Sequence, residues 1–469
     1  MKKDLASWRL LTPIIAGLVI WFLPTPASVD AQAWALLSIF VGTILLVMLG
    51  AMPMGAGTLL GLTTAILTNA LTFERAFLGY QSKITWLILV AFFIAQGFLQ
   101  TGLGKRISYL LISVFGKKCY GLGYGIVFAD FFLSPVVPSA AARSGGLVFP
   151  IVQSLSHALG SKAEDGTANK IGKYLILVAF QSAPITSAMF LTAMAANPLA
   201  AKFGLDVGVT LDWPTWAYAA IVPGLVNLML LPILMLKISP PEIKDTTGAV
   251  IHAKNELKKM GKMSRPEKNM SFCFISLLIL WCFGSFFNIN ATTAALMGLI
   301  FLLLSKTLKW KELLGLSIAW ETFVWFGAII GLAKGVSDGG VPDWFAKMVA
   351  SSLSGVSWPI AVLILFLIYF YAHYFFASST AQIGALFLPF IMSAITLGAP
   401  VLLVVAIFAF GSNIFGGITH YSLGPAPILF GAGYVSLKEW WKIGFIFSVI
   451  NIIVWLGVGS IWWKFIGLY

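Results

Sequence analysis

Charged residues are scarce in this 469-residue chain, at 10% of the total, where a soluble protein carries roughly 25%. Acidic residues are the scarcer kind: 17 Asp and Glu stand against 30 Lys and Arg, which gives a net charge of +13. Soluble enzymes and nucleic-acid-binding proteins need a polar surface that this composition does not supply. With 59% hydrophobic residues, the chain is instead predicted to be an all-α polytopic membrane protein, in which excess Lys and Arg set the orientation.

Other chemical signals are also missing. The only cysteines are Cys119, Cys273 and Cys282, and their spacing fits neither a zinc site nor a disulfide framework. No GxxxxGK[ST] phosphate loop occurs, which argues against ATP-driven transport. No catalytic constellation is present either. We therefore expect a protein that is not an enzyme and needs no metal or cofactor.

The N-terminal apolar run must be distinguished from a secretory signal peptide. It starts with basic residues, but it ends in Pro24-Thr25-Pro26 without a small-residue cleavage site, and another apolar run follows at once. An uncleaved first span is the expectation.

Eleven membrane-spanning helices are predicted from apolar runs of about 20 residues. Two of them contain an internal proline and small residues, at 195–198 and 424–427, and are therefore expected to be broken near the middle. The predicted spans are 9–23, 31–49, 52–70, 84–101, 173–205 (broken), 213–237, 271–287, 291–307, 320–336, 400–433 (broken) and 438–463.

Two further segments, 120–158 and 357–397, have a long apolar arm, a polar tip of small residues and a short second arm. Short second arms favour re-entrant hairpins, although two extra spans in each half remain an alternative. With the N-terminus in the cytoplasm, this topology places 23 of the 30 Lys and Arg on the cytoplasmic side, the C-terminus outside, and only Arg143 at membrane depth.

The chain also contains an internal repeat. The first hairpin tip, SAAARSGGLVFPI, aligns with SSTAQIGALFLPF at an offset of 239 residues, and the ends of the preceding spans align at 237. The predicted organisation is an extra span (1–30), a first repeat (31–237), a basic cytoplasmic linker (238–269) and a second repeat (270–469). Because each repeat has five spans, the two are inverted, and broken helices in inverted repeats are typical of secondary transporters.

The hairpin tips and span interruptions supply the candidate anion site. Free N–H groups at helix starts and the hydroxyls of Ser139, Ser378, Ser379 and Thr380 suit a carboxylate. Arg143 is a functional candidate because a charge at membrane depth is costly; the alternative is that it pairs with a buried acid such as Asp130 or snorkels to the interface. His373 is a further candidate, and His420 a weaker one.

These residues resemble the divalent anion/sodium symporter family, and within it the bacterial citrate/succinate and 2-oxoglutarate/malate exchanger group. The likeness rests on Pro-Ser-x-x-Ala-Arg-x-Gly-Gly at 138–146, on His373 followed by Ser-Ser-Thr-Ala at 378–381, and on the segment from Thr419 to Pro427. The resemblance implies a homodimer in which two transport domains move as elevators against a scaffold. It also implies substrate ligands, predicted here as Ser139, Ala140, Ala141, Arg143, Ser187, His373, Ser378, Ser379, Thr380, Thr419, Ser422, Gly424 and Pro425.

One departure from the family pattern bears on sodium. The family's tips carry Ser-Asn-Thr, whereas these read Ser139-Ala140-Ala141 and Ser378-Ser379-Thr380, so both amide oxygens are lost. We hypothesise that Arg143, and His373 when protonated, supply the charge that sodium brings in symporters.

The sequence thus predicts a sodium-independent exchanger of di- and tricarboxylates (succinate, malate, 2-oxoglutarate or citrate) in a bacterial inner membrane. The alternatives are a sodium-coupled dicarboxylate symporter on the same fold and, more remotely, a cation/proton or metalloid-anion antiporter. The absence of acids at the tips argues against cation exchange.

Overall fold

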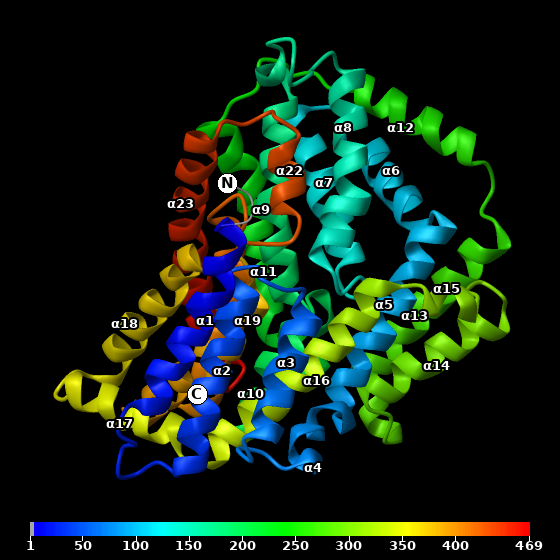
Figure 1. The fold of residues 1–469 in the computed structure, drawn as a ribbon. Coiled ribbons are helices and arrows are strands. Elements are labelled where there is room, and N and C mark those ends of the chain that lie inside the picture. The colour runs from blue at the N-terminus through cyan, green and yellow to red at the C-terminus, as the bar shows by residue number, and fades with distance from the viewer. Residues whose placement is uncertain (1–3) are drawn as a thin grey trace. The chain divides into compact units, whose positions relative to one another are not determined.

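Helices account for the regular secondary structure of residues 4–469, the part of the chain that the computed structural model describes (Figure 1). Within that part there is no β-strand, only an isolated bridge between Lys118 and Asp245. The prediction of an all-helical fold is confirmed. By contacts the chain divides into two interlaced units, each of which draws on both predicted repeats.

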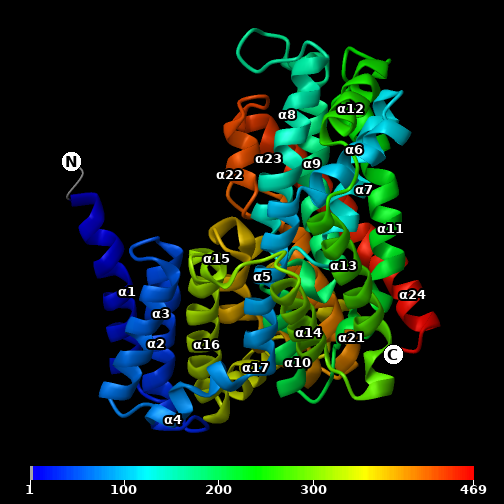
Figure 2. The same cartoon turned by 90° about the vertical axis from the view of Figure 1, so that its right-hand side faces the viewer.

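Unit 1 comprises residues 1–89, 198–210 and 316–408. It begins with three apolar helices, and α1 and α3 each pack against α2 (Figure 2). Its helices are α1 (Asp4–Phe22), α2 (Ala31–Met48), α3 (Met54–Leu67), α4 (Phe73–Ala76), α16 (Ser317–Asp338), α17 (Val341–Ser352), α18 (Trp358–Tyr371), α19 (Ser379–Gln382) and α20 (Leu388–Thr396).

Unit 2 comprises residues 90–197, 211–315 and 409–469. Its core lies around α9, which packs against α7, α8 and α11. Its helices are α6 (Leu103–Phe115), α7 (Cys119–Leu133), α8 (Phe149–Ala158), α9 (Gly172–Met189), α11 (Trp213–Ile238), α12 (Thr247–Met260), α13 (Arg265–Phe283), α14 (Ala291–Leu304), α15 (Trp310–Leu314), α22 (Ala426–Gly431), α23 (Leu437–Ile453) and α24 (Gly459–Phe465).

Three helices run from one unit into the other: α5 (Lys83–Thr101), α10 (Asn197–Asp206) and α21 (Val401–Ile414). Together with the helices of the two units, they place helical structure over each of the eleven ranges predicted as spans. Seven of the described helices are long and apolar enough to cross a membrane, and five shorter ones are also apolar. These findings make the chain a multi-pass membrane protein; the number of crossings stays a prediction.

Each predicted interruption overlaps a break between helices, but its last two residues lie in the first turn of the helix that follows. The first separates α9 from α10 at residues 190–196, close to the predicted position. The second separates α21 from α22 at residues 415–425, so that it is longer and begins earlier than predicted. It begins earlier because a turn of 3₁₀-helix over Phe415–Gly417 replaces the α-helix before the prolines are reached.

Equivalent elements recur at the offset seen in the sequence. The starts of α7 and α18 are 239 residues apart, and so are the starts of α8 and α20. A π-helix precedes each return arm, over Ala141–Val148 in the first hairpin and Ile383–Phe387 in the second. π-Helical turns are rare in proteins overall, but those that occur are often found at functional sites. The inverted repeat itself stays a prediction.

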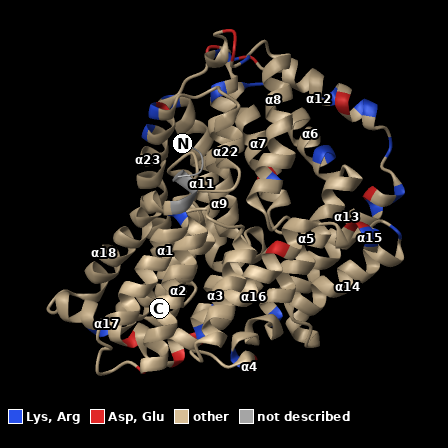
Figure 3. Cartoon of the chain, in the orientation of Figure 1, with Lys and Arg blue, Asp and Glu red and all other residues tan. Residues whose placement is uncertain are grey.

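A buried ion pair fixes the start of α13 in unit 2. Arg106 Nε donates to Glu267 Oε1 at 2.6 Å, and Arg106 Nη1 donates to the carbonyl of Gly261 at 3.0 Å. Glu267 also closes a capping box with Ser264 at the first turn of α13. The segment predicted as a polar linker is therefore folded, with α12 packed on α6 and α8. In unit 2, Lys and Arg gather around α12 and the end of α8 (Figure 3).

Candidate anion site

The Arg143 side chain lies in a cage of oxygen atoms in unit 2. It projects from the π-helix at the first hairpin tip and is 0% exposed. All three guanidinium nitrogens donate to oxygens of the hairpin or of the broken span. The contacts are Nε to Asp130 Oδ1 at 3.1 Å, Nη1 to the carbonyls of Val137 (3.1 Å) and Ala193 (2.8 Å), and Nη2 to the carbonyl of Ala183 (3.4 Å), Thr186 Oγ1 (3.2 Å) and Ser187 Oγ (2.9 Å).

Asp130 balances the charge of Arg143. It is also 0% exposed, and its carboxylate accepts further hydrogen bonds from Ser144 Oγ at 2.7 Å and from Thr186 Oγ1. The alternative that Arg143 pairs with Asp130 is therefore what the structure shows. A buried pair with satisfied hydrogen bonds is tolerated, whereas either ion alone would be strongly destabilising.

Amide side chains hold the interruption between α9 and α10 open. Asn197 Nδ2 donates to the carbonyls of Ser187 (2.8 Å) and Phe190 (3.0 Å), which the end of α9 leaves without helical partners. Asn413 Nδ2 donates in turn to Asn197 Oδ1 at 2.8 Å. The carbonyl of Ala193, which lies in this interruption, is thereby positioned to accept from Arg143.

The second interruption lies against the first hairpin tip. Ser422 Oγ accepts from the Thr419 N–H at 3.2 Å and donates to the Gly416 carbonyl at 2.6 Å, which closes the loop on itself. Gly424 then contacts the tip so closely that an added Cβ would lie 2.9 Å from Ala141 Cβ. The structure thus brings Ala141 and Gly424 together, with Pro425 buried beside them.

The second hairpin belongs to unit 1 and repeats the cap of the first. Ser378 Oγ accepts from the Ala381 N–H at 3.3 Å, as Ser139 Oγ accepts from the Ala142 N–H at 3.2 Å. These two serines therefore act as helix caps. Ser379 differs, because it is 6% exposed and its Oγ has no hydrogen-bond partner within the described chain. A buried hydroxyl without a partner is costly unless a ligand satisfies it.

His373 is buried in the same hairpin and contacts Gln382. Gln382 Nε2 donates to the Tyr369 carbonyl at 2.6 Å, so its Oε1 is the atom that faces His373 Nδ1, also at 2.6 Å. We infer from this network that His373 Nδ1 carries a hydrogen. Gln382 and Tyr369 lie 239 residues after Arg143 and Asp130. The second hairpin thus ties its arms together at the same positions with neutral groups.

The structure divides the predicted ligands between the two units. Within unit 1, the second hairpin holds His373, Ser378, Ser379 and the partly exposed Thr380; the remaining predicted ligands lie in unit 2. His420 is also in unit 2, where its Nδ1 accepts from Trp441 Nε1 at 3.1 Å. Gln382 is not among the residues predicted from the sequence, although its alignment with Arg143 was a signal for it.

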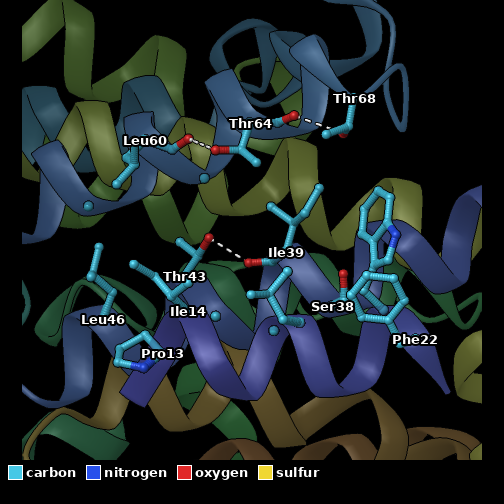
Figure 4. A pocket seen from close by; sticks show the side chains of 16 residues that line it. Pro13, Ile14, Phe22, Ser38, Ile39, Thr43, Leu46, Leu60, Thr64 and Thr68 are labelled. Atoms are coloured by element: carbon cyan, nitrogen blue, oxygen red, sulfur yellow. Dashed lines mark hydrogen bonds between the residues drawn. The ribbon is translucent and has the colours of Figure 1, made fainter. Parts of the chain in front are cut away.

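A cavity of about 390 Å³ in unit 1 does not suit an anion (Figure 4). It lies between α1, α2 and α3, and its lining is mostly apolar with no charged side chain. Its hydroxyl groups donate hydrogen bonds to backbone carbonyls of their own helices: Ser38 to Ala35, Thr43 to Ile39, Thr64 to Leu60 and Thr68 to Thr64. The hairpin tips therefore remain the better candidates for binding a carboxylate.

Known proteins resemble this chain along its whole length. Residues 4–469 match the family described as the sodium:sulfate symporter transmembrane region. A putative malate transporter, YflS of Bacillus subtilis (strain 168), is 48% identical over 98% of this chain and 96% of its own length. Dicarboxylate transporter 1 of spinach (Spinacia oleracea) chloroplasts is 46% identical over 98% of this chain and 81% of its own.

The fold has a counterpart among solved structures. The Alcanivorax borkumensis YdaH transporter superposes with a TM-score of 0.51 at 12% sequence identity, covering 98% of this chain and 97% of the other. That likeness concerns the fold alone. The family match and the transporters related to it along nearly the whole sequence exclude an enzyme. The chain belongs to the divalent anion/sodium symporter family, the one described as the sodium:sulfate symporter transmembrane region.

Proposed function

We propose that this protein exchanges dicarboxylates, with malate among them, across the membrane without coupling to sodium. The names of its relatives support the substrate class, since they include a putative malate transporter and dicarboxylate transporters. Transport of succinate, 2-oxoglutarate or citrate belongs to the same proposal. The observation that carries the sodium-independent part is the oxygen cage around Arg143.

The cage is made of the groups that bind a hard cation. Backbone carbonyls, hydroxyls and a carboxylate are the ligands such ions prefer, and here those of Val137, Ala183, Ala193, Thr186, Ser187 and Asp130 all point at the guanidinium. A tethered cation that fills this space leaves no room for a free one. Arg143 therefore performs the organising part of sodium's role, because it holds the hairpin tip against the broken span.

The positive charge that attracts a dianionic substrate has to come from other groups. Since Asp130 neutralises Arg143, the pair adds no net positive charge for a dianion. We propose that His373, when protonated, and the helix start behind Ser378 in the same hairpin supply the attraction. Ser379 contributes a hydroxyl that has no hydrogen-bond partner among the described residues.

Exchange is expected because an empty site would carry an unsatisfied polar group through the membrane. Without an anion, the buried Ser379 hydroxyl has no hydrogen-bond partner within the described chain, and such a group is costly in hydrocarbon. A bound dicarboxylate satisfies it in both directions of movement. The loaded carrier therefore crosses faster than the empty one, which makes transport depend on a counter-substrate.

We include the wider arrangement in the proposal. It comprises eleven spans with two re-entrant hairpins, a homodimer moving as elevators in a bacterial inner membrane, a cytoplasmic N-terminus and a C-terminus outside. The distribution of Lys and Arg along the sequence supports the orientation. The repeated hairpins and interrupted helices support the transporter architecture.

One observation favours the sodium-coupled alternative. Gln181 Oε1 and Asn413 Oδ1 are buried in unit 2 without a hydrogen-bond partner in the described chain. Neutral amide oxygens of this kind can coordinate sodium. The alternative predicts uptake driven by a sodium gradient into vesicles that contain no anion.

Counterflow in proteoliposomes tests the proposed exchange. Vesicles loaded with malate should accumulate external labelled malate, whereas vesicles loaded with chloride should accumulate almost none. A panel of unlabelled succinate, 2-oxoglutarate, citrate and a monocarboxylate, added outside, then ranks the substrates by competition. Equal uptake into malate-loaded and chloride-loaded vesicles would show net transport and contradict the exchange mechanism.

A further inference from the structure

A basic recess lies in unit 2 where α7 begins and α11 ends. Its volume is about 730 Å³, and we call it the α7–α11 recess. The segments before α7 and after α11 pair there as an antiparallel bridge: the Cys119 N–H donates to the Lys244 carbonyl, and the Thr246 N–H donates to the Lys117 carbonyl, both at 3.1 Å. This pairing fixes the backbone that carries the basic side chains.

The lysines of the recess have no acidic partners. Lys117, Lys118 and Lys244 line it and are exposed, and Lys237 lies beside it in the last turn of α11. None of the four forms an ion pair with another residue between positions 4 and 469. The recess therefore presents lysine charges that no ion pair within the described residues ties up.

Asp245 is the one acid in the lining, and it does not cancel this charge. Its Oδ1 accepts from the Thr247 N–H at 2.9 Å and from Thr247 Oγ1 at 2.6 Å. These hydrogen bonds lower the pKa of the Asp245 carboxyl, so it is ionised at neutral pH. Against the three lining lysines this leaves a net charge of +2.

The other side of the recess is apolar. Leu236, Pro240, Pro241 and the half-exposed ring of Tyr120 line it. Ile233, which precedes Leu236 by about one turn of α11, is 45% exposed. The helix is apolar and long enough to span a membrane. The recess thus joins a cluster of positive charge to an apolar helix face at the membrane boundary.

We propose that the α7–α11 recess binds an anionic phospholipid. The lysines hold its phosphate, and an acyl chain lies along the exposed apolar face of α11. Basic pockets at the ends of membrane helices bind anionic headgroups in this way, and the charge pattern of the sequence predicts that both helix ends lie on the cytoplasmic side. Free phosphate would contact only the lysines and leave the apolar face uncovered. In a zwitterionic lipid, the positive charge of the headgroup would offset the attraction between the lysines and the phosphate. Because α7 is the first arm of the first hairpin, the lipid contacts the base of the arm that carries Asp130.

Binding to the full-length protein in a neutral detergent tests the ligand class. The probes are dioleoyl phosphatidylglycerol, dioleoyl phosphatidylcholine and inorganic phosphate, followed by native mass spectrometry and thermal unfolding. Phosphatidylglycerol should remain bound and raise the melting temperature, and the other two should do neither. An equal effect of phosphate would indicate a free-anion site, and an equal effect of phosphatidylcholine would indicate a site indifferent to charge. Either result overturns the proposal.

A charge-matched pair of variants tests the location. Each lysine near an anionic lipid surface contributes on the order of fivefold in affinity, so Lys117→Gln/Lys118→Gln/Lys244→Gln should weaken phosphatidylglycerol binding about 100-fold. The control, Lys254→Gln/Lys258→Gln/Lys262→Gln, removes three exposed lysines on and just after α12 in the same unit and should bind normally. Equal loss in both variants would show non-specific attraction and refute the assigned site.

The unmodified protein gives an independent test that does not depend on the variants folding. A phosphatidylglycerol with a photoactivatable diazirine in its acyl chain should label the peptide containing residues 233–241. Labelling concentrated elsewhere, with that peptide unmarked, would contradict the proposed path of the chain along α11.

Discussion

Replacing Arg143 with glutamine is expected to lower dicarboxylate exchange by at least about 100-fold and to destabilise the fold by roughly 3–5 kcal/mol. The change leaves Asp130 buried without its counter-ion and removes the donors that join the first hairpin to the carbonyls of Ala183 and Ala193. Glutamine is the informative replacement because Gln382 occupies the equivalent position in the second hairpin. Exchange rates in proteoliposomes and thermal unfolding in detergent measure the two effects.

The double variant Arg143→Gln/Asp130→Asn separates charge from architecture. Removing both ions should recover most of the lost stability, because no unpaired charge stays buried. Transport should stay low, because the neutral pair cannot hold the same set of carbonyls. Sodium-free exchange at the normal rate in the Arg143→Gln variant would refute the role assigned to Arg143. Recovery of exchange in the double variant would show that only charge balance matters there.

Ser379→Ala is expected to raise the KM for dicarboxylates roughly 10- to 150-fold while leaving the melting temperature unchanged or higher. A hydrogen bond to a charged ligand contributes roughly 1.5–3 kcal/mol. Within residues 4–469, the Ser379 hydroxyl has no hydrogen-bond partner that its loss would disrupt. Removing an unsatisfied buried hydroxyl relieves a cost in the unliganded state. Initial rates at varied substrate, together with thermal unfolding, give both numbers.

The neighbouring serine provides the matched control. Ser378 Oγ caps the return arm through the Ala381 N–H, so Ser378→Ala should cost about 0.5–2 kcal/mol of stability. The two substitutions remove the same atom one residue apart and are expected to have opposite signatures. If Ser379→Ala loses stability and keeps its KM, then Ser379 is a structural residue and the proposed ligand role is wrong.

The sequence predicted much of the fold because membrane helices are defined by simple quantities. Apolar length located helices over every predicted span, and prolines located the break after α9. It did not predict α6 and α17, which follow Gly102 and Gly340 and lie outside the long apolar runs. Both glycines have a φ of 80°, a conformation that glycine adopts without strain and that composition alone does not reveal.

The sequence indicated which residue types belong to the candidate site, but not which of them form hydrogen bonds or ion pairs with each other. Arg143 and Asp130 are close in sequence, so their pairing was an open alternative before the structure. The carbonyls of Ala183 and Ala193 lie 40 and 50 residues from Arg143 and carry no side-chain signal. Likewise, Ser378 and Ser379 are alike in sequence, and only the hydrogen bonds distinguish the cap from the unpartnered hydroxyl.

The sodium dependence of malate exchange by the unaltered protein tests the central claim most directly. Malate-loaded proteoliposomes would be assayed for labelled malate entry with sodium on both sides, and again with sodium fully replaced by choline. If Arg143 occupies the cation's place, the two rates should be equal, and an inward sodium gradient should not drive uptake into vesicles without internal anion. A rate that falls to background in choline would contradict the account.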